Sequence, residues 1–318
     1  MTSSEPVTRR RRGRDVHGIV LLDKPSGISS NAALQITKRL YHARKAGHCG
    51  SLDPLASGLL PLCLGEATKV AGFLLDTDKH YQARCRLGVT TTTGDAEGEV
   101  LAVQPVGTYS AAELESVLAG FRGEQQQMPP MHSALKQQGQ PLYKLAHKGL
   151  SVERAARNIR VNTLHLVQHA GDELTLEVAC SKGTYIRTLV EDIGARLGCG
   201  AHVTALRRTG AGGYRVEDAI TLPTLQALAE QAGPTGLDHL LQPMQSALVG
   251  WPQLRLSDDS TYYLQRGQAV FVPQAPTSGW VSLYAADERF LGMGEMLGDG
   301  RVAPRRLINY PPANPCRE

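Results

Sequence analysis

The sequence lacks the features that mark zinc-binding, secreted or membrane proteins. Its six cysteines are dispersed over 318 residues, with no Cys-x-x-Cys pair and no histidine at zinc-finger spacing. Free thiols in a reducing compartment are therefore expected, and a zinc site is not. No apolar run approaches the roughly 18 residues that a membrane span needs. No apolar segment of the signal-peptide type follows the N-terminal arginines, so we expect a cytoplasmic protein without membrane association.

The sequence also lacks a large excess of positive or negative charge. The formal net charge is only +4, and the first 15 residues hold five arginines against Glu5 and Asp15. Because this segment supplies most of the excess, a face that binds nucleic acid would have to arise by local clustering. We expect residues 1–15 to be a basic disordered tail. It is either an arm that touches phosphates or a solvated terminus without a partner.

Strand and helix patterns occur together without regular alternation. Residues 79–87 and 164–179 alternate apolar and polar positions, which predicts strands of an antiparallel sheet with one solvated face. A short strand is expected at 17–22, followed by a helix through Leu40 with its cap among residues 29–31. Further helices are expected at 111–118, 185–197 and 222–229. This mixture indicates an α+β fold.

Two segments divide the chain. Residues 124–157 are polar and rich in glutamine, which is typical of a functional flap or a mobile insertion in a compact domain. A boundary falls near Gly250-Trp251-Pro252, and short strands with glycine turns follow it. We expect a main domain over 16–250, with the flap at about 124–157, and a small β-rich domain over 251–318.

The run from Gly47 to Gly58 carries the most chemical information. Asp53 alone has a structural explanation, since Asp followed by Pro is a favourable start for a helix. Leu55, Leu59 and Leu62 would continue that helix, and His48 alone reads as a loop histidine. Glycines on both sides of Asp53, however, permit close backbone approach to the carboxylate.

Two later residues have a structural and a functional interpretation. Tyr81 lies on the apolar face of the strand at 79–87, where it is either a core residue or a stacking platform for a base. Arg187 follows the glycine turn of Cys180-Ser181-Lys182-Gly183. It either pairs with Glu191 one helical turn further on, or serves the same site as Asp53.

Four segments in order resemble the motifs of the TruB family of pseudouridine synthases. They are KPSGISS at 24–30, GHCGSLDPLASG at 47–58, DKHY at 78–81 and KGTYIR at 182–187. The resemblance extends from residue 17 to about 214, and four ordered motifs are specific where any one would be weak. The C-terminal segment around Gly292-Met293-Gly294-Glu295 is similar to the PUA-like module of bacterial members.

The resemblance implies a pseudouridine synthase catalytic domain with a mixed or antiparallel sheet, a flap, and a PUA-like RNA-binding domain. The implied activity is isomerisation of uridine to pseudouridine at position 55 in the T-loop of tRNA. The implied partner is the T-arm of tRNA, with no obligate protein partner, and a monomer is expected. By the same resemblance, Asp53 is the catalytic carboxylate, His48 helps to extrude the target nucleotide, and Tyr81 stacks on the flipped base. Tyr185 and Leu206 would line the uridine pocket.

The implied chemistry fits these residue types. Pseudouridine formation moves the ribose from N1 to C5 of the base and adds nothing, so neither a cofactor nor a metal is needed. One carboxylate suffices, whereas a typical glycoside hydrolase needs two, and no second acid stands beside Asp53 in the sequence. Attack on the sugar carbon and removal of a ribose proton both remain open. Arg187, which matches the arginine that pairs with the catalytic carboxylate, would favour its ionised form.

Three alternatives remain at this point. A guide-RNA-dependent relative would share the catalytic motifs, but the flap and the short C-terminal module favour a stand-alone enzyme. An RNA-binding or tRNA-folding protein would retain every function in Asp53→Asn. A nucleoside hydrolase, the most remote alternative, would release free uracil.

Overall fold

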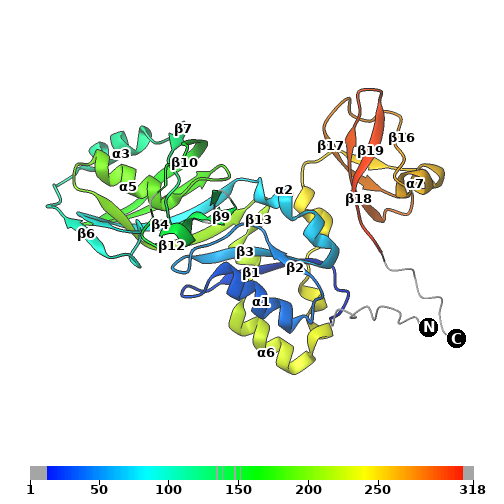
Figure 1. Ribbon diagram of the computed structural model, residues 1–318, viewed down its shortest axis with the longest axis horizontal. Helices are drawn as coiled ribbons and strands as arrows, with labels where there is room; N and C mark the ends of the chain where they lie inside the picture. The colour runs from blue at the N-terminus through cyan, green and yellow to red at the C-terminus, as the bar shows by residue number, and fades with distance from the viewer. Residues whose placement is uncertain (1–12, 134, 138, 147, 151, 311–318) are drawn as a thin grey trace, which may run out of the picture.

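The computed structural model describes residues 13–133, 135–137, 139–146, 148–150 and 152–310. In this part of the chain, two sheets form two lobes joined by short helical segments (Figure 1). None of the described helices combines the length and apolar character that a membrane crossing requires. The predicted tail lies almost entirely outside the described residues. At its described end, Arg14 is already anchored, because its Nη1 donates to the carbonyl of Pro234 at 2.7 Å.

The larger sheet has ten strands, which lie between Gly18 and Thr221. Its main path runs β14 (Ile220–Thr221), β1 (Gly18–Lys24), β3 (Ser57–Leu64), β12 (Ala201–Ala211), β4 (Lys79–Leu87), β11 (Glu173–Cys180), β10 (Arg157–Ala170) and β7 (Gly123–Gln127). Two short strands lie off this path, β2 (Ala46–His48) beside β3 and β13 (Tyr214–Arg215) beside β12. Most pairs are antiparallel, while β3 with β12 and β1 with β14 are parallel. The expected mixed sheet is confirmed.

Helices and small ribbons complete the lobe. The helices are α1 (Ser30–Leu40), α2 (Ala71–Leu75), α3 (Ala111–Ala119), α4 (Leu142–Ala146), α5 (Ile186–Arg196) and α6 (Leu222–Ala232). The ribbons are β5 (Val89–Thr91) with β6 (Val100–Val103), and β8 (Lys136–Gln137) with β9 (Gln140–Pro141). The 3-10 turns are η1 (Gly65–Lys69), η2 (Val216–Asp218), η3 (Pro234–Leu240) and η4 (Met244–Leu248). The predicted cap of α1 is confirmed, since Ser29 Oγ accepts from the Ala32 amide at 3.1 Å.

The smaller lobe is a five-stranded sheet with one helix. Its strands run in the order β15 (Gln253–Arg255), β17 (Trp280–Tyr284), β18 (Phe290–Met296), β19 (Arg301–Leu307) and β16 (Val270–Phe271). Helix α7 (Asp258–Gln265) packs against β16 and β19. This lobe has a core cluster of its own, so it is built as a domain rather than as an extension of the first sheet.

The alternation of apolar and polar residues along β4 explains which face of the sheet is buried. Ala83, Cys85 and Leu87 are buried on one face, whereas Gln82 and Arg84 are exposed on the other. The predicted strand at 164–179 proves to be a hairpin, β10 and β11, whose second strand pairs with β4. Burial on one face only is what an antiparallel sheet with a solvated side requires.

One expectation from the sequence is corrected by the structure. No helix follows Asp53, because residues 57–64 form the central strand β3, which is buried almost throughout. Five of these eight residues are apolar and form a buried strand, and Asp53 does not cap a helix. At the start of the predicted flap, residues 124–127 belong to β7 and pair with β10.

Candidate active site

Asp53 lies on a loop between β2 and β3 that the neighbouring elements hold at several points. The amide of Leu52 donates to Ser30 Oγ at 2.7 Å, and this hydroxyl donates back to the Leu52 carbonyl at 3.0 Å. The amide of Gly27 donates to the carbonyl of Pro54 at 2.8 Å. The KPSGISS segment at the start of α1 therefore serves as a support for the loop that carries Asp53.

Arg187 connects this loop to two other segments. Its Nε lies 3.0 Å from Asp53 Oδ2, its Nη1 donates to the Thr93 carbonyl at 2.8 Å, and its Nη2 donates to the His132 carbonyl at 2.7 Å. The guanidinium is only 5% exposed, whereas the Asp53 side chain is 41% exposed. Of the two partners, Asp53 is the one that a substrate can reach. Arg187 forms ion pairs with Asp53 and with Asp95, and not with Glu191 one helical turn further on.

A second carboxylate, Asp95, meets the same guanidinium and was missed in the sequence. Its Oδ2 lies 3.5 Å from Arg187 Nη1, and the side chain is 4% exposed. Its Oδ1 accepts from Thr93 Oγ1 at 2.5 Å and from the Glu97 amide at 3.1 Å. The signal was a polar turn, Thr-Thr-Thr-Gly-Asp, of the kind in which Asp binds backbone amides two residues on. Asp95 is buried and fully engaged, so it holds Arg187 and does not face a substrate.

The charges around Asp53 oppose one another. Burial raises the pKa of Asp53 and the nearby Asp95 adds to this rise, while Arg187 and Lys24 lower it. Lys24, a second residue without a role assigned from sequence, is fully buried, and its Nζ donates to the carbonyls of Ile28 and Pro25 at 2.7 and 2.8 Å. Burial lowers the pKa of Lys24 to about 8, and Asp53 acts against that shift. The ionised form of Asp53 is thus favoured by two cations and opposed by partial burial and by Asp95.

Two tyrosines are within range of the Asp53 charge. Tyr81 is half-buried on β4, opposite Val178 of β11 and Arg208 of β12. Tyr185 directly precedes α5, where its amide donates to Gln127 Oε1 at 2.8 Å and its carbonyl accepts from Gln127 Nε2 at 3.0 Å. Burial raises the pKa of both phenols, and the Asp53 charge raises them further. Both side chains are therefore neutral at physiological pH.

His48 lies at the end of β2, opposite Leu62 of β3. Its Nδ1 is buried without a hydrogen-bond partner among the described residues. Burial, together with the charge of Arg208, lowers the pKa of His48, so the ring is neutral at pH 7. Arg208 is 1% exposed and donates to the carbonyls of Leu59 at 2.7 Å and Gly50 at 3.3 Å. It stiffens the loop between His48 and Asp53.

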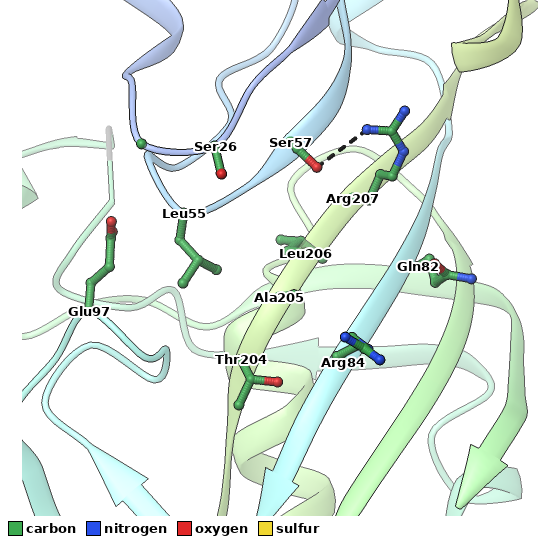
Figure 2. A pocket seen from close by; sticks show the side chains of 11 residues that line it. Ser26, Leu55, Ser57, Gln82, Arg84, Glu97, Thr204, Ala205, Leu206 and Arg207 are labelled. Carbon is green, nitrogen blue, oxygen red and sulfur yellow. Dashed lines mark hydrogen bonds between the residues drawn. The ribbon is translucent and has the colours of Figure 1, made fainter.

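Leu206 lies at a pocket of about 480 Å³ beside the loop, bounded by Leu55 on the opposite side (Figure 2). The pocket is lined by Ser26, Gly27, Leu55, Ser57, Gln82, Arg84, Glu97, Thr204, Ala205, Leu206 and Arg207. Arg207 also donates to Asp23 at 2.7 and 3.0 Å. Of the predicted site residues, only Leu206 lines this pocket. Arg187, Tyr81 and Tyr185 form a separate group, which is centred on the carboxylate of Asp53.

Metal-binding side chains are not gathered around this group in the described part of the chain. Among the residues that the structure describes, no three His, Cys, Asp or Glu side chains are arranged to hold an ion. The five described cysteines are free thiols.

Three family descriptions match successive parts of the chain. Residues 38–186 match "TruB family pseudouridylate synthase (N terminal domain)", and residues 187–249 match "tRNA pseudouridylate synthase B C-terminal domain". Residues 252–308 match "Pseudouridine synthase II TruB, C-terminal".

Curated relatives match over most of the chain. A protein of Nitrosococcus oceani called tRNA pseudouridine synthase B is 57% identical, covering 94% of this chain and 97% of that protein. One of the same name from Stutzerimonas stutzeri is 56% identical, with 94% and 98% covered. Among solved structures, a Cbf5-Nop10-Gar1 complex matches with a TM-score of 0.71 and 26% identity, covering 91% of this chain and 84% of that chain.

Proposed function

The chain belongs to the TruB family of pseudouridylate synthases and is an isomerase that forms pseudouridine in tRNA, and we propose that Asp53 is its catalytic carboxylate and uridine 55 of the T-loop its target. The observation that most strongly supports a catalytic role for Asp53 is that it is the exposed partner of a guanidinium that is otherwise buried. Arg187 and Asp95 are buried, while the carboxylate of Asp53 remains open to a substrate. A charged group that is fixed on one side and accessible on the other is suited to act on a bound ribose.

The reaction leaves the composition of the nucleotide unchanged. The N1–C1′ bond breaks, the uracil turns while it stays bound, and C5 bonds to C1′. The C5 proton leaves to solvent and N1 gains a proton. Asp53 acts in the ionised form, either by adding to C1′ or by removing a ribose proton to give a glycal. Arg187 holds the carboxylate in one orientation in both routes, because its Nε contacts Oδ2 directly.

A uridine within a folded T-loop must leave its stack before Asp53 can reach it. Extrusion costs a few kcal/mol, and stacking on protein aromatic rings offsets part of this cost. Tyr81 and Tyr185 are neutral aromatic side chains near the carboxylate and serve as the platform and the wall of the base pocket. The neutral ring of His48, whose Nδ1 has no protein partner among the described residues, fills the space the base vacates.

The flap contributes to closure of the site. The His132 carbonyl binds Arg187, and Arg154 Nη1 donates to the Pro129 carbonyl at 2.8 Å, which ties the two ends of the flap together. A flap held against the guanidinium would exclude water from the carboxylate once RNA is bound. We propose that the chain acts in the cytoplasm as a monomer on free tRNA, without a guide RNA or partner protein.

The proposal is tested with the purified chain and an unmodified tRNA transcript, with no other protein or RNA. Pseudouridine is mapped by carbodiimide modification and primer extension. We expect a single new stop at position 55, and none in a transcript with cytidine at that position. Modification only after addition of a guide RNA, or at another uridine, would contradict the proposal. Binding and refolding of tRNA without any pseudouridine would favour the RNA-folding alternative.

A further inference from the structure

Helix α2 lies where the two lobes meet (Figure 1). Its Phe73 ring makes edge contacts with both tryptophans of the chain, at centroid distances of 4.7 Å to Trp251 and 5.1 Å to Trp280. The two tryptophan rings are 6.0 Å apart. Trp251 belongs to the connection between the lobes, and Trp280 begins β17 of the small lobe. Three aromatic rings in mutual contact fix an orientation more firmly than a simple apolar patch does.

A continuous apolar cluster extends from this junction to the catalytic loop. It joins residues of the small lobe to Leu74 of α2 and to Cys49, the neighbour of His48. The small-lobe members are Phe290, Met293 and Ile308. A displacement of the small lobe therefore has to be absorbed by side chains that also pack under the loop, because close-packed interiors transmit strain.

The other side of α2 faces the catalytic loop and the strand that carries Tyr81. A Cβ placed on Gly50 would lie 3.9 Å from Leu75 Cδ2, so the last residue of α2 stands next to the loop. Lys79, two residues before Tyr81, donates from Nζ to the carbonyls of Leu75 at 2.6 Å and Leu74 at 3.2 Å. The end of α2 is thereby bonded to the first residue of β4.

Polar contacts hold the same junction just before α2. Lys69 Nζ donates to the carbonyl of Leu307 at 2.6 Å, and the Asn309 amide donates to Glu66 Oε2 at 2.7 Å. Lys69 and Glu66 also pair with each other at 2.5 Å. The small lobe is thus bonded to η1 and packed on α2, which together form one rigid link toward the loop.

We propose that Phe73 and Trp280 are positioning residues. Through their contact, the C-terminal domain holds α2 in place, and α2 in turn holds the loop from Gly47 to Asp53 and the start of β4. This inference rests on the proposed role of Asp53. The C-terminal domain then acts on the rate of the chemical step as well as on RNA affinity. A domain that only bound RNA would need no packing against the segment next to the catalytic loop.

The test uses the full chain and separates rate from affinity. The single-turnover rate is measured at saturating enzyme by release of tritium from uridine C5 in tRNA, and the dissociation constant for tRNA is measured in parallel. We expect Trp280→Ala to slow the rate by about 10-fold, because small displacements of reacting groups cost that much or more. Its dissociation constant should stay within about twofold of wild type, and Trp280→Phe, which keeps an edge contact, should recover most of the rate.

The control is Phe271→Ala, which removes an aromatic ring from the same domain that is 65% exposed and outside the three-ring contact. It should leave the rate unchanged. Leu75→Ala combined with Trp280→Ala should be no slower than the slower single variant, because both act through α2. If Trp280→Ala does not fold, Phe73→Leu takes its place.

A wild-type rate in Trp280→Ala at saturating enzyme, or a loss confined to the dissociation constant, would overturn the inference and leave the proposed function intact. A wild-type chain that releases no tritium would instead remove the proposed function.

Discussion

Replacement of Arg187 by lysine keeps the positive charge but removes the geometry that the site depends on. The arginine reaches Asp53, Asp95 and two backbone carbonyls from one planar group. A lysine carries its three donors on a single nitrogen and cannot serve these divergent partners at once. We therefore expect Arg187→Lys to bind tRNA but to react slowly.

The size of the effect follows from the bond that is lost. A hydrogen bond to a charged group contributes about 1.5–3 kcal/mol. At about 1.4 kcal/mol for each factor of ten, losing the bond that orients Asp53 lowers the rate by about 10- to 100-fold. Stability should also fall, because Asp95 is 4% exposed and would be left with a poorly placed partner.

The assay is single-turnover tritium release at saturating enzyme across a range of pH. Arg187→Gln provides the comparison in which the charge is lost as well. Arg187 lowers the pKa of Asp53, so its loss in Arg187→Gln should move the acidic limb of the rate profile to higher pH. Arg122→Lys is the matched control, since that arginine bonds Glu115 and the Leu164 carbonyl away from the site.

Arg187→Lys with a wild-type rate would refute the orienting role of the guanidinium. An unchanged acidic limb in Arg187→Gln would refute the account of the Asp53 pKa. A loss in Arg122→Lys as large as in Arg187→Lys would show that the effect is not specific to the site.

Three further results are expected. Gly58→Ala should lower the free energy of unfolding by about 2–5 kcal/mol in urea titrations, because φ of Gly58 is +100° and the new Cβ would lie 2.3 Å from the Arg208 carbonyl oxygen. The control is Gly267→Ala, where φ is +86° and no atom lies within 4 Å of the new Cβ. An effect of Gly58→Ala no larger than that of Gly267→Ala would contradict the steric explanation. Tyr81→Leu should slow tritium release far more than Tyr81→Phe if the ring serves as a platform, and equal rates in all three proteins would remove Tyr81 from the mechanism. Asp53→Asn should melt at a temperature no lower than wild type at pH 7.5. Burial raises the folded-state pKa of Asp53, so the protonated carboxyl group stabilises the fold below the unfolded-state pKa of about 3.9. This contribution is lost as the pH rises through the folded-state pKa. A clear drop in melting temperature would show that the ionised carboxylate stabilises the fold.

Much of the framework followed from local patterns. The alternating pattern of residues 79–87 predicted strand β4, and the serine before residue 30 predicted the start of helix α1. Both predictions succeeded because burial of one face and side-chain capping depend on a few neighbouring residues. The pattern after Asp53 misled for the opposite reason. Leucines at 55, 59 and 62 fit a helical period, but β3 is buried between β1 and β12, and a fully buried strand has no polar face to reveal its period.

The candidate site was predictable only in part. The resemblance to the TruB family implied that Arg187 pairs with Asp53, and the two side chains lie 3.0 Å apart in the structure. Asp95 and Arg208 were not found, because each reaches the site through long-range pairing, of Asp95 with Val203 and of Arg208 with Gly58. The roles assigned to His48, Tyr81, Tyr185 and Leu206 stay predictions.

The most direct measurement is tritium release from uridine C5 in a tRNA T-arm, with wild type and Asp53→Asn compared at equal tRNA occupancy. An account centred on Asp53 predicts one tritium released per tRNA by wild type and none above background by the variant, because the amide can neither add to C1′ nor accept a ribose proton. Release by Asp53→Asn at the wild-type rate, or no release by wild type, would contradict it.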